Sequence, residues 1–514
     1  MNKIKIPAAL ALFGFFLLIC ICTEAQRSLP RGVPEAEGVS SADILKFVKA
    51  ASNSRNEFHS FMLLRHGKVI AEGWWNPYRP DLRHTLYSCS KSFTATAVGF
   101  AVTENKLSLS DKVTAFFPND LPDTVSPFLS ELTVKDVLMM SDGQEPDPTF
   151  TVASKVVNWR KGFLATPIIH EPGTQFLYNS LGTYMLSAIV QKVTGQNVLA
   201  YLRPRLFDPL GITGEDWETD SAGINTGGWG LRLKTEDMAK FAELFLQKGK
   251  WNGRQILPAS WVGEASTMKI MQDPSAPQSK KDSSDWLQGY CYQMWRCRHD
   301  AYRGDGAYGQ FMIVMPAEDA VIAITAETAD MQNEINLVWQ YLLPAFKSKP
   351  LQPDPSSRTK LEAALKDLAL PLSKGLENTV LPAHHNFSFA SNDLHLTSAA
   401  FNFDKNICTV QFTTANGTFT IPFARSTWAK SETRFPGPSL TAALLEDNHV
   451  VYPAKIAASY RWKDASTLEL ALRYIESPHS EIFSCHFEGD KLSMDVTPSI
   501  GFGKTVIHAD GTAN

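Results

Sequence analysis

The chain has 514 residues, of which 44% are hydrophobic and 20% are charged, a balance typical of a folded protein with two or three domains. Its 49 Lys and Arg residues stand against 53 Asp and Glu residues, so the formal net charge is -4 at pH 7. Because binding to nucleic acid needs a basic surface, this mild negative charge excludes nucleic acid as a partner.

The first element in chain order is an apolar N-terminal segment, 1–25, that predicts a secretory signal peptide. Two lysines precede the apolar run 6–21, and Ala25 provides the small residue before a cleavage site. We expect a periplasmic or secreted protein that touches the membrane only if this segment stays uncleaved. An uncleaved anchor and lipoprotein processing at Cys20 or Cys22 are less favoured, because the run is short for a span and bulky residues precede both cysteines.

The segment 38–346 is predicted to form one α+β domain. The segments 60–65 and 68–72 are predicted to form two strands around the turn at His66 and Gly67. Helices are predicted at 88–104, 133–140, 181–194, 235–248 and 333–346. Thr133 and Thr235 are expected to cap the second and fourth of these helices, and Gly195 is expected to end the third. Paired strands are predicted at 310–315 and 320–325. Strands at both ends with helices between them imply the α+β class.

A stretch rich in Pro, Ser and Lys, 347–359, predicts a linker to a second domain, 360–514. Alternating segments separated by turn residues predict strands at 387–389, 400–403, 407–413, 418–423, 456–462, 467–474, 482–488 and 491–496. This second domain is therefore a mostly antiparallel β domain, and no catalytic constellation is visible in it.

Five cysteines follow the signal segment: Cys89, Cys291, Cys297, Cys408 and Cys485. An odd number in an oxidising compartment leaves at least one unpaired. Pairing of Cys408 with Cys485 and of Cys291 with Cys297 are open hypotheses. The spacing of Cys and His residues does not suit a zinc site.

The strongest chemical signal is Ser88-x-x-Lys91 at the start of a predicted helix. Positions i and i+3 share a helix face, so the Lys91 amine can reach the Ser88 hydroxyl. Desolvation and positive potential would keep that amine neutral enough to accept the serine proton, and the helix N-terminus offers amides to a developing oxyanion. The alternative, an ordinary exposed helix start, is disfavoured by the small and apolar residues that follow. Cys89 faces about 100° away from Ser88 and is interpreted as a core residue.

A second element, 172–180, delivers Tyr178 and Ser180 just before a predicted helix. A phenol beside a lysine can move a proton between the nucleophile and the leaving group. Ser180 is a candidate hydrogen-bond donor to the substrate. The alternative interpretation is a packing tyrosine followed by a serine that caps the next helix.

A third element, 303–310, is rich in glycine and leads into a predicted strand. Glycines at the mouth of a strand let a substrate approach the backbone closely, which makes Tyr308 and Gly309 candidate substrate contacts. The Gln310 amide would supply a second oxyanion donor. Asp305 is a candidate contact for a substrate amine. The alternative is a hairpin turn with a turn-forming aspartate.

In this order the three elements resemble the serine beta-lactamase and penicillin-binding-protein superfamily, above all its class C and esterase-like side, which includes 6-aminohexanoate-dimer hydrolases. Supporting segments match at 132–141, at 206–212, at 227–231, which contains Trp229, and at 251–258. The resemblance covers roughly 38–346. It implies an antiparallel sheet flanked by helices, with a helical subdomain.

The resemblance also implies an acyl-enzyme mechanism. Ser88 would attack a carbonyl, Lys91 and Tyr178 would handle protons, and the amides of Ser88 and Gln310 would hold the oxyanion. Water would then hydrolyse the acyl-enzyme, without a metal or organic cofactor. The substrate contacts would be Ser180, Asp305, Tyr308, Gly309 and Trp229.

Two departures from the superfamily pattern reduce the range of activities that the resemblance implies. Ser180 replaces an Asn that many relatives carry, as in the dimer-hydrolase and esterase variants. Residues 307–309 lack the Lys or His that lactamases and peptidases place before the final glycine, where a cation would pair with a substrate carboxylate. Unless Arg303 compensates, this absence disfavours a beta-lactamase or a D-alanyl-D-alanine peptidase.

We therefore predict an exported serine hydrolase that cleaves an amide or ester in a small-molecule or peptide-like substrate. The alternatives are a beta-lactamase or D-alanyl-D-alanine peptidase, and a non-catalytic binding or sensor protein of the same fold. No local pattern ties His170 or His299 to Ser88, so both histidines are interpreted as structural.

Overall fold

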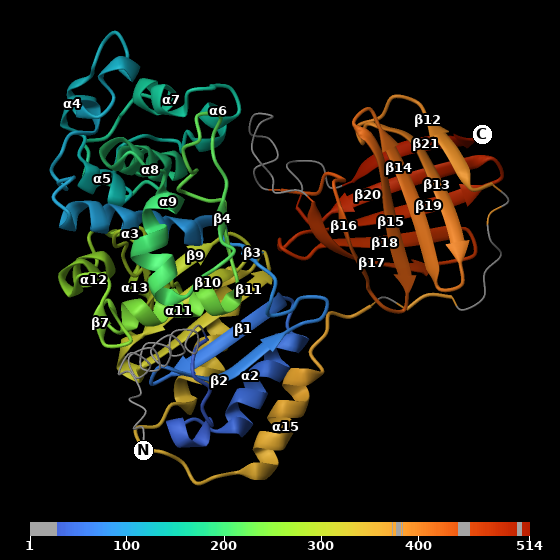
Figure 1. Ribbon diagram of the computed structural model, residues 1–514, viewed down its shortest axis with the longest axis horizontal. Coiled ribbons are helices and arrows are strands. Elements are labelled where there is room, and N and C mark those ends of the chain that lie inside the picture. Colours follow the sequence, from blue (N-terminus) through green and yellow to red (C-terminus); the bar gives the residue numbers. More distant parts are fainter. Residues whose placement is uncertain (1–27, 373, 377–381, 383, 440–452, 501–505) are drawn as a thin grey trace, which may run out of the picture.

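The computed structural model describes residues 28–372, 374–376, 382, 384–439, 453–500 and 506–514. The predicted signal peptide, 1–25, lies outside the described residues. Within them, no helix combines the length and the apolar character needed to cross a membrane. Figure 1 shows an α+β domain on the left and a β domain, at the C-terminal end of the chain, on the right.

The α+β domain is built on a six-stranded antiparallel sheet in the order β2-β1-β11-β10-β9-β8. Its strands are β1 (Glu57–Arg65), β2 (Lys68–Trp74), β8 (Trp295–Arg296), β9 (Tyr302–Gly306), β10 (Gln310–Met315) and β11 (Ala320–Glu327). Both predicted strand pairs are confirmed, and β1 lies beside β11. The sheet therefore joins the two ends of the domain's sequence.

Helices cover both faces of this sheet. In β1, Phe61 and Leu63 pack into one core, whereas Met62 and Leu64 pack into the other. The first face carries α2 (Ser41–Asn53), with α14 (Met331–Leu337) and α15 (Pro355–Lys366) beside it, and the second carries α3 (Ser90–Thr103) and α11 (Thr235–Leu246). Because neither face meets water, β1 reads as a continuous apolar run rather than an alternating one.

A helical subdomain is inserted between the first and last strands, and Figure 1 shows it gathered on one side of the sheet. Its helices are α4 (Pro127–Glu131), α5 (Val134–Leu138), α6 (Thr149–Ala153), α7 (Trp159–Ala165), α8 (Ser180–Thr194), α9 (Val198–Leu202) and α10 (Asp208–Leu210). Smaller elements near the sheet are α12 (Ala259–Ser266), α13 (Gln278–Ser283), β3 (His84–Thr85), β4 (Asp216–Trp217), β5 (Leu231–Leu233), β6 (Lys250–Trp251) and β7 (Arg254–Gln255).

Most helix ends agree with the predicted caps. Thr133 caps α5, and Gly195 ends α8 in the left-handed conformation with φ 74. One cap was predicted one residue late, since Lys234, not Thr235, is the N-cap of α11. Asn179 caps α8, so the alternative interpretation of Ser180 as its cap is wrong. The helix predicted over 333–346 is divided, with a π-helix over Val338–Leu342 after α14 and a final 3-10 turn over Leu343–Ala345.

Helix α3 packs so closely on α12 that a methyl group at Gly99 would lie 2.3 Å from the Trp261 ring. Gly99→Ala is therefore expected to lower the free energy of unfolding by about 1–3 kcal/mol, because overpacking displaces a large buried ring. Chemical denaturation measures this change. Gly263→Ala on α12 is the control, since nothing lies within 4 Å of its added methyl group. Equal stability of the two variants would contradict the close packing.

The C-terminal domain is a closed β-barrel. Its strands are β12 (Asn386–Phe389), β13 (Leu396–Asp404), β14 (Ile407–Thr414), β15 (Gly417–Arg425), β16 (Ala429–Thr433), β17 (Ala454–Trp462), β18 (Thr467–Tyr474), β19 (Ser480–Glu488), β20 (Lys491–Pro498) and β21 (Ile507–Ala513). The neighbours are antiparallel, and a parallel contact of β15 with β17 closes the sheet. Alternate residues such as Phe401, Val410 and Phe412 fill the interior. The short β16 and the terminal β21 were missed by the sequence pattern.

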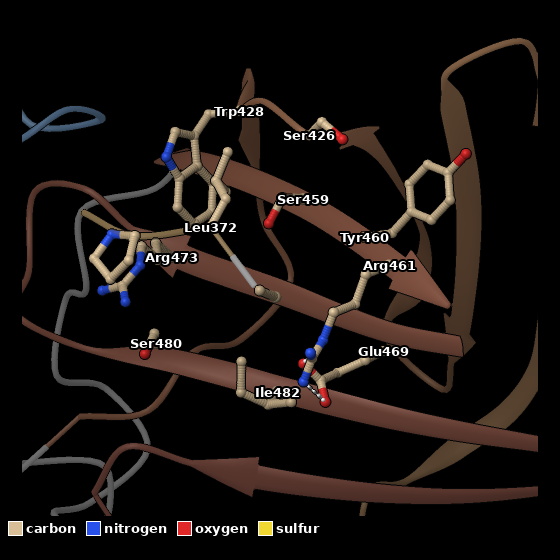
Figure 2. Close-up of a pocket in the computed structure, with 12 residues that line it drawn as sticks. Leu372, Ser426, Trp428, Ser459, Tyr460, Arg461, Glu469, Arg473, Ser480 and Ile482 are labelled. Atoms are coloured by element: carbon tan, nitrogen blue, oxygen red, sulfur yellow. Dashed lines mark hydrogen bonds and ion pairs between the residues drawn. The ribbon is translucent and has the colours of Figure 1, made fainter. Parts of the chain in front are cut away.

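The connection between the domains differs in detail from the predicted linker, 347–359. Helix α15 already begins at Pro355 and packs against α2. The chain then reaches the outer wall of the barrel at Leu372, beside a cavity of about 80 Å³. Figure 2 shows that cavity, where Arg461 and Glu469 form an ion pair on the barrel wall.

All five described cysteines are free and buried. Neither hypothesised pair, Cys408 with Cys485 or Cys291 with Cys297, forms a disulfide in this part of the chain. The barrel and the α+β domain are therefore held by packing and hydrogen bonds in the described residues.

Candidate active site

Ser88 lies in a 3-10 turn, Tyr87–Cys89, that leads directly into α3. It is the one residue from Leu86 to Ala101 that is not buried. The polar side chains of this buried helix are satisfied internally; for example, Ser92 donates to the carbonyl of Gln293 at 3.0 Å. The helix is thus a fixed support that presents a single hydroxyl to solvent.

Lys91 is buried one helical turn after Ser88. Its Nζ lies 3.1 Å from Ser88 Oγ, 2.9 Å from Ser180 Oγ and 2.7 Å from the carbonyl oxygen of Gly228. Burial lowers the pKa of the Lys91 ammonium to about 7, against the raising effect of the Asp147 and Asp305 carboxylates. A neutral amine is therefore available near neutral pH.

The three contacts of Lys91 define its role. A neutral amine has two N–H donors and one lone pair. The Gly228 carbonyl can only accept, and Ser180 Oγ offers a second acceptor. The lone pair then faces Ser88 Oγ and can receive its proton. This arrangement is that of a general base beside a nucleophile.

Tyr178 closes the other side of Ser88. Burial raises the pKa of its phenol well above the ordinary value, although a hydrogen bond with Ser88 opposes the shift. Lys91 Nζ lies 5.0 Å from the centre of the Tyr178 ring, which stacks on Trp295 with centroids 5.7 Å apart. The phenol stays protonated and can donate, so Lys91 is the group suited to accept the first proton. Asn179 fixes the turn by donating to Asp142 at 2.9 Å.

The β9–β10 hairpin forms the third wall. A methyl group at Gly306 would lie 2.2 Å from the Leu86 carbonyl, so only glycine allows this strand to approach the Ser88 turn. Asp305 pairs with Arg303, whose Nη2 lies 2.7 Å from Oδ2. Burial raises the pKa of the Asp305 carboxyl, and the Arg303 guanidinium opposes that shift. Ala307 follows at the edge of the opening.

These walls enclose an open cleft of about 470 Å³, which we call the Ser88 cleft. Its lining residues are Ser88, Tyr178, Trp286, Trp295, Asp305, Ala307, Ala329, Asp330, Met331 and Gln332. The lining is aromatic and apolar with two carboxylates, and none of these residues is a Lys, Arg or His. Arg303 is fully buried, stacked 4.3 Å from the Trp286 ring, and so presents no cation to the cleft.

Several predicted site residues lie outside the lining of the Ser88 cleft. Trp229 packs in the core against Trp159, with centroids 5.7 Å apart. Gln310 is fully buried, and its side-chain amide donates to the carbonyls of Ala307 and Ala326, which ties the hairpin together. The half-buried Tyr308 packs beside Tyr87.

Gly309 is also outside the lining, and Glu334 lies directly behind it. A methyl group on Gly309 would meet Glu334 Oε2 at 2.1 Å. Burial raises the pKa of the Glu334 carboxyl well above its ordinary value, so this side chain stays protonated. Gly309 therefore gives close backbone packing against a buried acid.

Cys89, His170 and His299, the other candidate nucleophile and bases, do not line the Ser88 cleft. The Cys89 thiol donates to the Gln310 carbonyl at 3.1 Å, and burial raises its pKa well above the ordinary value. It is therefore a neutral thiol rather than a nucleophilic thiolate. His170 pairs with Glu145, and His299 lies against Trp339, both outside the lining of the cleft.

Other members of the site were missed by sequence reasoning. The Gly228 carbonyl that orients Lys91 lies in the segment 227–231, which was noted only for Trp229. Trp286 in a loop, Trp295 in β8 and Asp330 at the N-cap of α14 line the cleft from separate segments. No local pattern marks these residues, because their role depends on which segments the fold brings together.

The low pKa of Lys91 makes activity pH-dependent. Because only the neutral amine accepts the serine proton, kcat/KM is expected to rise with pH through about 7 and then level off. The Asp147 carboxylate raises this pKa, so Asp147→Asn should move the rise to lower pH. Glu171→Gln, which removes an exposed carboxylate that does not act on Lys91, is the control. An unchanged or higher midpoint in Asp147→Asn would contradict this electrostatic account.

Comparison with known proteins agrees with this geometry. The family model described as Beta-lactamase matches residues 59–342, just over half of the chain. A 6-aminohexanoate-dimer hydrolase of Paenarthrobacter ureafaciens is 28% identical over 282 residues, which are 51% of this chain and 71% of the relative. A putative D-alanyl-D-alanine carboxypeptidase of Escherichia coli K12 is 29% identical over 143 residues, 25% of this chain and only 33% of that relative.

A solved structure shares the fold. The putative 6-aminohexanoate-dimer hydrolase from Bacillus anthracis superposes with a TM-score of 0.50 at 19% identity, covering 61% of this chain and 86% of its own. The family match and the related dimer hydrolase support a serine hydrolase. The chain belongs to the Beta-lactamase family, and the predicted beta-lactamase-like fold with a C-terminal β domain is confirmed.

Proposed function

We propose that this protein is an exported amide or ester hydrolase that forms an acyl-enzyme on Ser88. The observation that carries the proposal is the contact set of Lys91, whose amine is directed at Ser88 Oγ by Ser180 and the Gly228 carbonyl. Ser88 Oγ attacks the carbonyl carbon while its proton passes to Lys91 Nζ. Tyr178 then supplies a proton to the leaving nitrogen or oxygen and regains one from the Lys91 ammonium, and water releases the acyl group from Ser88 as a carboxylic acid.

Two backbone amides would stabilise the oxyanion. The Ser88 amide lies in the 3-10 turn that leads into the N-terminus of α3, where helix geometry leaves N–H groups free. For the second donor we propose Ala307 in place of Gln310. Ala307 lines the cleft with Ser88, whereas Gln310 is fully buried and pairs with Gly306 across the hairpin.

The charges of the Ser88 cleft favour a neutral or amine-bearing acyl group. Asp305 and Asp330 line the cleft, and the one nearby guanidinium, Arg303, is buried and already paired. A carboxylate on either side of the scissile bond would meet no cation among the lining residues. This supports a small-molecule or peptide-like amide or ester over a beta-lactam or a D-alanyl-D-alanine peptide, since both carry a carboxylate.

Intact mass spectrometry with a fluorophosphonate probe tests the nucleophile. We expect one adduct on the wild-type chain and none on Ser88→Ala. The absence of an adduct on folded wild-type protein would sink the assignment and favour a binding or sensor protein. Adduct formation without turnover of any substrate would favour the sensor as well.

A matched substrate series tests the charge preference. The p-nitroanilides of 6-aminohexanoic, hexanoic and adipic acids differ in their terminal group: ammonium, methyl or carboxylate. We expect the carboxylate member to have the lowest kcat/KM, about tenfold or more below the ammonium member, a difference of roughly 1.4 kcal/mol. Preference for the carboxylate member would overturn the charge preference, and turnover of a chromogenic cephalosporin would instead favour the lactamase and peptidase alternative.

Export is proposed from the N-terminal segment alone. Cleavage after Ala25 would leave Gln26 as the first residue of the mature protein. The mass and N-terminal sequence of protein recovered from the periplasm or the medium test this. Recovery of the full-length chain in the cytoplasm would count against it.

A further inference from the structure

The turn between β18 and β19, residues 475–479, joins the barrel to the α+β domain beside the nucleophile. Ile475 packs into the core on the α2 face of the central sheet. The carbonyl of Glu476 accepts the Thr85 N–H at 3.0 Å. Since Thr85 lies three residues before Ser88, the turn is bonded to the segment that delivers the nucleophile.

Ion pairs hold this turn in place. Arg473, at the end of β18, binds Glu57 of β1 through both nitrogens of its guanidinium fork, at 2.5 and 2.8 Å. Glu57 also lies 3.1 Å from the buried ring of His59. Figure 2 shows Arg473 and Ser480, which flank the turn, at the same end of the barrel-wall cavity. The barrel is thus anchored on β1, the strand of the main sheet that lies between β2 and β11.

His479 ends the turn and is fully buried. Its Nδ1 lies 2.7 Å from Glu327 Oε1, and its Nε2 is hydrogen-bonded to the Tyr87 hydroxyl. A carboxylate only accepts, so Nδ1 carries the proton and Nε2 accepts the phenolic O–H. A chain of hydrogen bonds therefore runs from β11 through the barrel's histidine to the residue before Ser88.

Tyr87 needs this support because of its backbone. It has φ 46, in the left-handed region that residues other than glycine seldom occupy. The His479 ring also lies against Tyr308, with centroids 5.0 Å apart, and Tyr308 is left-handed with φ 64. One imidazole thus contacts both the residue before Ser88 and the residue after Ala307.

We propose that His479 is a positioning residue of the hydrolase. By holding the Tyr87 hydroxyl it fixes the left-handed turn that sets Ser88 Oγ against Lys91. The inference rests on the proposed role of Ser88, and it makes the barrel a part of the active site rather than an appended module. No proton of the reaction passes through His479.

The test compares rates of fluorophosphonate labelling at Ser88 in the full-length protein. We expect His479→Ala and Tyr87→Phe each to slow labelling by about 10- to 100-fold, because small misplacements of a nucleophile are costly. His479→Gln offers a donor and an acceptor at similar spacing, so it should restore most of the rate. The double variant His479→Ala with Tyr87→Phe should be no slower than either single variant, since both break one bond.

Controls separate positioning from general damage. Labelling is expressed per folded molecule, and the pH midpoint should stay near that of the wild type because Lys91 is untouched. His508→Ala removes an exposed barrel histidine paired with Asp495 and should change nothing. If His479→Ala fails to fold, Tyr87→Phe, which removes one hydroxyl, carries the test.

The outcomes distinguish the two proposals. If the wild type is labelled and His479→Ala and Tyr87→Phe are labelled at the same rate as the wild type, the positioning role is overturned and the proposed function stands. Additive losses in the double variant would also overturn it. Absence of wild-type labelling would overturn the proposed function and this inference with it.

Discussion

Lys91→Met is expected to lower kcat/KM by about 10³- to 10⁴-fold, because it removes the base that activates the nucleophile. Methionine is unbranched and of similar length, so the buried space between Ser88 and the Gly228 carbonyl stays filled. Steady-state kinetics with a p-nitroanilide, together with the rate of fluorophosphonate labelling, measure the loss. Both rates should fall together, since acylation is the step that needs the base.

Two further variants distinguish the loss of the base from the loss of a buried positive charge. Lys91→Arg keeps the positive charge but cannot give up a proton, so it should be as inactive as Lys91→Met. Lys240→Met removes another buried ammonium, which lies 3.2 Å from the Gly211 carbonyl, and should affect stability without affecting the rate per folded molecule. Activity of Lys91→Met within tenfold of the wild type would show that another group accepts the Ser88 proton.

Tyr178→Phe is expected to lower amide turnover by roughly 10²- to 10³-fold, because the phenol protonates the leaving nitrogen. The phenylalanine ring can keep the stacking contact with Trp295, so the wall of the cleft is retained. A p-nitrophenyl ester should suffer much less, since nitrophenolate leaves without being protonated. The ratio of amide to ester kcat/KM is therefore the decisive measurement.

Tyr290→Phe is the matched control for Tyr178→Phe. Tyr290 is buried beside Tyr178, with ring centroids 6.4 Å apart, and it does not line the Ser88 cleft. It should leave the amide-to-ester ratio unchanged. Equal losses on the amide and the ester in Tyr178→Phe would mean that the phenol positions Ser88 instead of acting as an acid.

Local features of the sequence determined the nucleophile pair and much of the fold. Ser88 and Lys91 are three residues apart across a 3-10 turn and the first turn of α3, so their proximity follows from local helical geometry. Caps and glycines such as Thr133 and Gly195 set helix ends through bonds within a few residues, and the alternating strands of the barrel follow from a period of two. The α+β class and the antiparallel β domain could be predicted because these signals agree with one another. The beta-lactamase-like fold was predicted from the resemblance of the three elements around Ser88, Tyr178 and 303–310 to that superfamily.

Only the tertiary structure decided what surrounds that pair. The pKa of Lys91 depends on burial and on the carboxylates of Asp147 and Asp305, which come from distant segments. The carbonyl of Gly228 is 137 residues away in sequence, yet it orients the amine. Trp229 and Gln310 lie in segments that resemble the superfamily, but both side chains are buried in the core. The spacing of residues in the sequence does not show this burial.

The contact of His479 with Tyr87 spans 392 residues and two domains. Nothing in either local sequence specifies it, because the barrel could have docked elsewhere with the same strands. The reacting groups could be predicted from local sequence, since their geometry depends on one helix start and one turn. The tertiary structure decided their protonation, orientation and support, since burial, charge and close approach arise only when distant segments pack together.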